Sequence, residues 1–233
     1  MPRSVLVFAI MMSTTAPAAY ATQFTIFSDS GQSAADIQDT VDAFRSALDP
    51  FNPPNPVAGD PQGRRQIDWD AAPDAVSDPN AFPGDFFNFN AFPRARGIEF
   101  QSKAGPGGAE GFQLSSTAAS GEPIEFGRDD DFTVFSPERL FAPTGGNLFD
   151  VEFFLPEEPD APAGSRGLGV VFTDNDYLGD DGFSNASFAV EDINGTDLGT
   201  FYAEPSPDAG LSFLGVLFDA PFIRRAMYDV GTI

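Results

Sequence analysis

The stretch Leu211–Phe218 reads LSFLGVLF and is apolar at nearly every position. A half-exposed strand alternates apolar and polar residues, whereas a strand that is covered on both faces is apolar along its whole length. The stretch therefore predicts a central strand with a layer of structure on each side. Ala226, Tyr228 and Val230 alternate with polar residues shortly afterwards and predict one more strand.

Short alternating runs, each bounded by Gly, Pro, Asn or Asp, fill the chain from Gly97 onward. A hairpin is expected where Phe188 and Val190 lead into Asn194-Gly195, a tight-turn pair, with Leu198–Ala203 as the returning strand. About ten short strands with no helix between them predict an antiparallel, jelly-roll-like β-sandwich over residues 97–233. The other expected strands carry Ile98 and Phe100; Phe112 and Leu114; Ile124 and Phe126; Phe132 and Val134; Val151, Phe153 and Leu155; and Leu168, Val170 and Phe172.

The N-terminal part of the sequence predicts three different elements. Thr22–Phe27 alternates as a short strand does. Residues 33–48 predict one N-terminal helix, because apolar residues recur at helical spacing and Ser33 is a suitable N-cap. Residues 49–96 hold many prolines and phenylalanines and predict a long irregular loop that is packed against the sandwich. The sequence is thus all-β with a single helix.

The first 21 residues have the pattern of a secretory signal peptide. Arg3 is followed by the apolar run Ser4–Met12 and then by Ala19-Tyr20-Ala21, a small-x-small cleavage site. A run of about nine apolar residues is too short for a bilayer core, which needs about 20. We therefore expect an extracellular or periplasmic protein without a membrane span, whose residues 22–233 form a single domain.

Composition excludes several classes of function. Lys and Arg number 12 against 35 Asp and Glu, a net charge of −23, which repels phosphate backbones and argues against nucleic-acid binding. The sequence has no Cys and no His, so thiolate chemistry, Ser-His-Asp triads, His-ligated metals and disulfides are excluded. What remains is the chemistry of oxygen ligands and of carboxylates.

Several segments resemble a group of uncharacterised secreted bacterial proteins. The first is Gly63–Asp70, which reads GRRQIDWD and matches a GRR-x-I-x-WD region; Phe135–Phe141 (FSPERLF) and Val171–Asp174 (VFTD) match further motifs of the group. The resemblance covers most of the chain after the leader. It implies an exported β-sandwich and supplies no catalytic residues. Similar proteins usually continue into a further strand beyond the position of Ile233.

The loop that follows the predicted strand at Leu168 reads TDNDYLGDDG and suggests a cation site. It places Asp174, Asp176, Asp180 and Asp181 within eight residues. Carboxylates at this density suit Ca²⁺, which takes six to eight oxygen ligands, although the loop lacks the glycine and closing glutamate of an EF-hand. The alternative is an ordinary solvated turn, because acidic residues are abundant throughout the chain.

Trp69, with Arg64 and Arg65 beside it, is the candidate ligand-binding group. Trp69 could offer a stacking surface to a sugar or a protein, and the two arginines could clamp a carboxylate. The alternatives are that Trp69 is mostly buried and anchors the long loop, and that the arginines pair with neighbouring acids. The expected function is a secreted, noncatalytic surface, structural or glycan-binding module that is stabilised by Ca²⁺, with an extracellular glycan or a cell-surface protein as partner.

An enzyme is the alternative function. Glycosidases need only two carboxylates at a suitable separation, and Glu138, Asp150 and Glu152 are the candidates for a polysaccharide-active enzyme. Nothing in their spacing selects a pair.

The end of the chain gives a separate prediction. The segment from Phe222 to Ile233 predicts a strand with no successor to pair with it, and therefore an exposed sheet edge. Because an unpaired edge invites pairing with another chain, we expect self-association.

Overall fold

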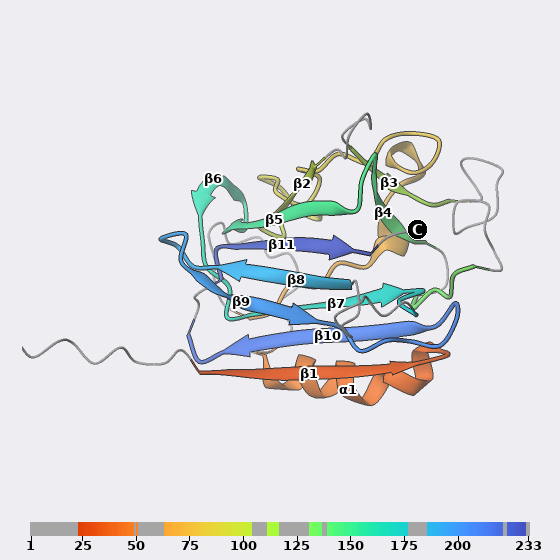
Figure 1. Ribbon diagram of the computed structural model, residues 1–233. Coiled ribbons are helices and arrows are strands. Elements are labelled where there is room, and N and C mark those ends of the chain that lie inside the picture. The colour runs from red at the N-terminus through yellow and green to blue at the C-terminus, as the bar shows by residue number, and fades with distance from the viewer. Residues whose placement is uncertain are drawn as a thin grey trace, which may run out of the picture.

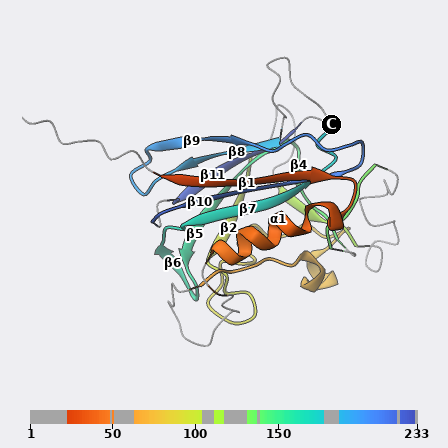
Figure 2. The same ribbon diagram turned by 90° about the horizontal axis from the view of Figure 1, so that it is seen from below.

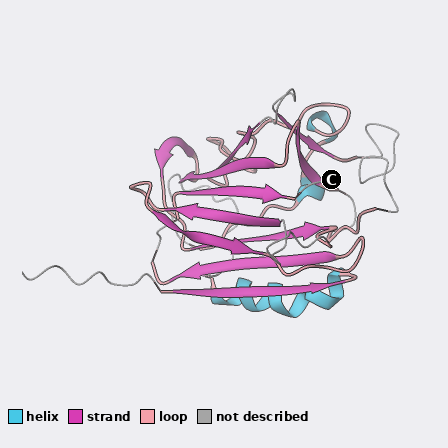
Figure 3. Ribbon diagram, viewed as in Figure 1, coloured by secondary structure: helices cyan, strands magenta, loops and turns pink. Residues whose placement is uncertain are grey.

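The computed structural model describes residues 23–48, 50, 63–103, 111–116, 131–136, 139–176, 186–220 and 223–231. Strands dominate these residues, as Figure 3 shows. The elements are β1 (Phe24–Gly31), α1 (Ala34–Ala47), the short 3-10 helices η1 (Trp69–Ala71) and η2 (Asp74–Val76), β2 (Ile98–Lys103), β3 (Gly111–Leu114), β4 (Phe141–Thr144), β5 (Leu148–Leu155), β6 (Glu158–Pro162), β7 (Gly167–Thr173), β8 (Ala186–Glu191), β9 (Asp197–Tyr202), β10 (Leu211–Phe218) and β11 (Arg225–Val230).

Two antiparallel sheets make up the sandwich (Figure 1). The smaller sheet has the strand order β1-β10-β7, and the larger has the order β2-β5-β11-β8-β9, with β6 paired to the last residues of β5. β3 and β4 pair with each other separately. The predicted fold class, an all-β antiparallel sandwich with one N-terminal helix, is confirmed.

Strand β10 has the central position that its sequence predicts. Leu214, Val216 and Phe218 lie in the core between the two sheets. Leu211 and Phe213 belong to a second cluster, which lies between the smaller sheet and α1. Figure 2 shows α1 lying across this sheet on the side away from the larger sheet. The order of layers is therefore helix, three-stranded sheet, six-stranded sheet.

Helix α1 begins at the predicted cap and buries the predicted stripe. Ser33 and Asp36 form a capping box, in which the Asp36 carboxylate accepts from the Ser33 backbone N–H at 2.9 Å. Ile37, Val41 and Phe44 are buried against the sheet. Burying one apolar stripe against a sheet is what stabilises a helix of this length, since short helices are marginal in isolation.

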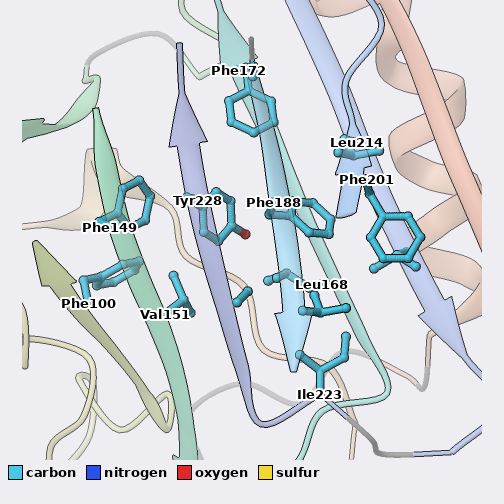
Figure 4. Packing of buried hydrophobic residues seen from close by; sticks show 14 of the residues in the cluster. Phe100, Phe149, Val151, Leu168, Phe172, Phe188, Phe201, Leu214, Ile223 and Tyr228 are labelled. Carbon is cyan, nitrogen blue, oxygen red and sulfur yellow. The ribbon is translucent and has the colours of Figure 1, made fainter. Parts of the chain in front are cut away.

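A row of aromatic rings crosses the inner face of the larger sheet (Figure 4). Strand register places Phe149, Tyr228, Phe188 and Phe201 side by side on β5, β11, β8 and β9. The rings of Phe149 and Tyr228 are stacked, with centroids 4.8 Å apart. Burial raises the pKa of Tyr228 far above its usual range, so this side chain is a neutral core residue.

The segment 63–96 is irregular, as predicted, and packs against the sandwich. Phe82, Phe86 and Phe87 are buried in the main core, whereas Phe89 and Phe92 are exposed. Two short 3-10 helices, which the sequence analysis did not predict, lie within the segment. Arg139, just before β4, is buried and holds the segment through hydrogen bonds to Ser77 and Asp74.

Three details of the strand prediction are wrong. Strands β4 and β6 were not expected; β6 contains two prolines, which an edge strand tolerates. Phe132 and Val134 lie in an irregular segment instead of a strand. The pair Ile124 and Phe126 lies outside the described residues.

The prediction for the end of the chain is also wrong. Strand β11 is not an exposed edge, because it pairs with β5 on one side and with β8 on the other. Its pairing partners come from segments about 35 to 80 residues earlier in the chain, so no local pattern could reveal them. In the described part of the chain, no helix has the length and hydropathy needed to cross a bilayer.

Candidate functional site

Trp69 is half-buried and contacts aromatic rings of the protein itself. Its ring is stacked on Phe141 with centroids 4.3 Å apart, and it meets the rings of Phe82, Phe87 and Phe100 at 5.7 to 5.8 Å. The Asp68 carboxylate caps η1 by accepting from the Asp70 backbone N–H. These contacts are those of an anchor that attaches segment 63–96 to the core. A ligand-binding role for Trp69 stays a prediction.

The arginines near Trp69 also contact the protein. The Arg64 guanidinium donates to the carbonyl of Arg45, near the end of α1, and to the Gln66 side chain, both at 3.2 Å. Arg65 lies near Arg96; burial, together with the charge of Arg65, lowers the pKa of Arg96. The structure thus brings Arg65 close to another cation. The proposed ligand-binding role of Arg64 and Arg65 stays a prediction.

The acidic loop after β7 lies close to Asp208, a residue that was not among the predicted ligands. Carboxylate oxygens of Asp174, Asp176 and Asp208 all lie within 4.8 Å of one another. Asp208 comes from the segment before β10, and the pairing of β7 with β10 carries it to the end of β7. The Asp174 backbone N–H donates to the carbonyl of Gly210 at 2.8 Å, which fixes this approach. Asp180 and Asp181 lie outside the described residues.

Asp174 has the most strained environment of this cluster. Its backbone is left-handed, with a φ of 53°, and its carboxylate accepts from the Ala209 N–H at 3.0 Å. Burial raises the pKa of Asp174, the Ala209 hydrogen bond opposes that shift, and the charges of Asp176, Asp208 and Asp131 add to it. A cation close to Asp174 would oppose this shift by stabilising the ionised carboxylate. An oxygen-only set of this kind fits a hard divalent cation.

A hollow of about 250 Å³ lies on the outer face of the larger sheet. We call it the sheet-face hollow; its lining comes from five neighbouring strands. Residues that alternate along a strand point to opposite faces, so most of the lining residues are outward neighbours of the inward aromatic row, of which Phe149 and Tyr228 also border the hollow. The lining residues are Lys103, Leu148, Phe149, Asp150, Ser187, Ala189, Thr200, Met227, Tyr228 and Asp229.

The carboxylates of the sheet-face hollow are held in fixed positions. Asp150 is only 5% exposed at its side chain and pairs with Lys103 at 2.7 Å and with Arg225. Asp229 accepts from the Asn147 amide at 2.6 Å and from the Gly231 N–H at 3.0 Å. The lining itself carries one basic side chain, Lys103, and two acidic ones, and Arg225 beside it is shared between Asp150 and Glu191. In a chain of net charge −23, the acids of this surface are thus partly neutralised by neighbouring bases.

Two hydroxyls in the hollow have unused hydrogen-bonding capacity. Ser187 and Thr200 lie at adjacent rows of β8 and β9, and neither hydroxyl makes a hydrogen bond within the described residues. Ser187 is only 8% exposed as a residue, and it lies at the floor of the hollow. Thr200 is exposed, so the two hydroxyls are free to donate to and accept from a ligand that enters the hollow.

The carboxylates named for an enzyme are engaged in ion pairs. Asp150 and Glu152 both lie on the outer sheet face, and Glu152 pairs with Arg224 at 3.1 Å. Each carboxylate therefore has a basic partner where a glycosidase would need one proton donor and one free base. Glu138 lies outside the described residues.

Comparison with known proteins adds no family to this description. No protein-family model matches the chain, and neither the curated proteins nor the solved structures compared with it gave a match. The fold defines the protein as an antiparallel β-sandwich. The likeness of Gly63–Asp70 to secreted bacterial proteins stays a prediction from the sequence.

Proposed function

We propose that this protein is a secreted, noncatalytic β-sandwich that binds a neutral sugar ring in the sheet-face hollow and holds Ca²⁺ at Asp174, Asp176 and Asp208. The observation that carries the sugar-binding proposal is the pair of unused hydroxyls, Ser187 and Thr200, beside an apolar floor. Export is supported by the leader pattern of the first 21 residues.

The chemistry of the hollow suits a pyranose ring. A pyranose has hydroxyls around its rim and apolar C–H groups on its faces. Ala189 and Met227, register partners on β8 and β11, supply an apolar floor. Ser187, Thr200 and the carboxylates supply hydrogen-bonding groups. Tyr202 of β9 is the register partner of Ser187 of β8, and it is 42% exposed at the edge of the same face.

Size and charge restrict the ligand further. A volume of about 250 Å³ is below the roughly 300–1,000 Å³ of sites for drug-sized ligands, so one ring is the expected occupant. Lys103 and Arg225 are both engaged by Asp150, so neither base is available to an anionic ligand. The overall charge of −23 also repels anionic polymers, so a neutral glycan is favoured.

The calcium proposal is supported by three carboxylates from two loops. Asp174 and Asp176 follow β7 and Asp208 precedes β10, so a bound cation would join the two loops. Ca²⁺ would offset the repulsion among the carboxylates and would stabilise the folded state by mass action. Asp180 and Asp181 stay predicted additional ligands.

A titration with neutral methyl glycosides tests the sugar-binding proposal. We expect methyl glycosides of glucose, galactose, mannose or N-acetylglucosamine to give saturable amide shifts at Ser187, Ala189 and Thr200 in ¹⁵N-resolved spectra. Thr200→Val keeps the shape but removes one hydroxyl, so it should weaken binding about fivefold. Ala189→Leu fills the floor and should abolish binding.

Gln101→Ala is the matched control. Gln101 is exposed on the same sheet face but does not line the hollow, so binding should be unchanged. The proposal fails if none of the four glycosides gives saturable shifts. It also fails if Ala189→Leu, still folded by its spectrum, binds the sugar as the wild type does.

A further inference from the structure

Strand β1 has one free edge in the part of the chain that the structure describes. It pairs with β10 along eight residues, from Phe24 opposite Phe218 to Gly31 opposite Leu211. It is the outermost strand of the smaller sheet, as Figure 1 shows. Every second backbone N–H and C=O of an outer strand points away from the sheet, so β1 presents a row of groups that no other strand pairs within the described residues.

Apolar side chains accompany this free edge. Phe24 is 46% exposed and Ile26 is 50% exposed, although Phe24 packs on Phe201 at 5.2 Å and on Phe218 at 5.7 Å. Phe24 therefore points between the two sheets, and Ile26, two residues on, shares that face. The core of the sandwich is left partly uncovered beside β1.

The edge is also free of charge over most of its length. Residues 23–28 read QFTIFS and contain no ionisable side chain. Asp29 is the first acid of β1, and its carboxylate accepts from the Thr40 hydroxyl at 2.7 Å. Natural edge strands usually carry lysine, proline or a bulge that prevents pairing, and β1 has none of these.

Other outer strands are less suited to pairing. β6 carries Pro159 and Pro162, β2 carries Glu99 and Lys103, and β9 has a register shift where it meets β8. Thr133 lies beside the end of β7. Its N–H donates to the Thr173 hydroxyl, and its carbonyl accepts from that hydroxyl. Within the described residues, β1 is the outer strand that combines an open edge, exposed apolar side chains and no charge.

We infer that β1 is a docking edge for a second copy of this chain. Two molecules that each carry an excess of acids repel one another, so a contact between copies needs an uncharged surface, and residues 23–28 supply one. An antiparallel β1–β1 pair about a two-fold axis joins the two smaller sheets into one of six strands. In such a pair, residues of one face lie opposite residues of the same face, so Phe24 and Ile26 of each copy cover those of the other. This inference is independent of the proposed sugar binding.

Sedimentation equilibrium with an edge-blocking variant tests the inference. The wild type should be a dimer whose association strengthens as salt is added, because salt screens repulsion between acidic surfaces without weakening an uncharged contact. Ile26→Lys places a charge at the centre of the edge and should weaken dimerisation at least tenfold; because Ile26 is half exposed, the lysine can extend into water and leave the fold intact. Ile193→Lys is the control, since Ile193 is 63% exposed in the turn between β8 and β9.

A crosslinking experiment gives a second readout. The chain has no cysteine, so Ile26→Cys carries one thiol, and a short bis-maleimide should join two copies. Ile193→Cys should not crosslink under the same conditions. A wild type that sediments as a monomer at every salt and protein concentration would overturn the inference. So would a dimer that Ile26→Lys leaves unchanged, or one that dissociates as salt is added.

Discussion

The position of Trp69 indicates whether segment 63–96 is anchored to the core or offers a stacking surface to a ligand. Its stacking on Phe141 and its contacts with Phe82, Phe87 and Phe100 make it an anchor for segment 63–96. Trp69→Ala should therefore lower the free energy of unfolding by about 3 kcal/mol, toward the lower end of the range for buried aromatic residues because the ring is only half-buried. Urea denaturation measures this change.

Phe92→Ala is the control for that measurement. Phe92 belongs to the same segment but is 64% exposed, so its replacement should change stability by no more than about 0.5 kcal/mol. If Trp69→Ala were as stable as Phe92→Ala, the anchor role would be rejected and the exposed stacking surface would return as the better explanation.

Asp174 gives a prediction that depends on pH. Its pKa is raised in the folded state by burial and by neighbouring acids, so the folded state binds its proton more tightly than the unfolded state does. The stability associated with the protonated form is present at low pH and is lost as pH rises through the raised pKa. Without Ca²⁺, Asp174→Asn should therefore raise the Tm near neutral pH and leave it unchanged at a pH below the usual carboxyl range.

Added Ca²⁺ should reverse this difference in Tm, so that the wild type becomes more stable than Asp174→Asn. Ca²⁺ is expected to raise the Tm of the wild type and to have little effect on Asp174→Asn, while a chelator should remove the difference. Asp192→Asn is a control, because Asp192 lies in the β8–β9 turn away from the cluster. A wild-type melt that neither Ca²⁺ nor chelator shifts would leave Asp174, Asp176 and Asp208 as a solvated turn.

At the scale of elements, the contact of α1 with the smaller sheet depends on two glycines. Gly169 of β7 and Gly215 of β10 are register partners, and a Cβ on either would lie 2.6 to 2.8 Å from the Phe44 ring. The absent side chains make the space in which Phe44 packs. Gly215→Ala should therefore cost about 1 to 3 kcal/mol by overpacking.

A double mutant separates overpacking from a loss of strand structure. Phe44→Leu removes part of the ring that meets the new Cβ, so Gly215→Ala should cost less in that background. A cost that is the same in both backgrounds would show that Phe44 does not determine the need for glycine at this position.

Elements with a local signal could be predicted from the sequence, and long-range pairings could not. The apolar residues of β10 and the stripe Ile37, Val41 and Phe44 of α1 are patterns within one segment, and both elements were predicted. The place of β11 between β5 and β8 depends on partners far away in the chain, and its prediction as an edge was wrong. Asp208 was not predicted as a ligand for the same reason, because only the β7–β10 pairing brings it to Asp174.

At the scale of the whole molecule, function is proposed to be divided among separate surfaces of one sandwich. The sheet-face hollow lies on the larger sheet, the carboxylate cluster lies at the end of β7, and the free edge belongs to the smaller sheet. The hollow could not be found from sequence, since Ser187, Thr200 and Met227 are ordinary outward residues until the register places them together. In a chain of net charge −23, Lys103 and Arg225 offset the charge of Asp150 beside the proposed sugar site.

A crystal structure of the protein with the methyl glycoside that binds most tightly tests the central proposal most directly. We predict one pyranose ring over Ala189 and Met227, with its hydroxyls bonded to Ser187 and Thr200. A sugar found instead against Trp69, Arg64 and Arg65, with the sheet-face hollow filled only by water, would contradict the proposal.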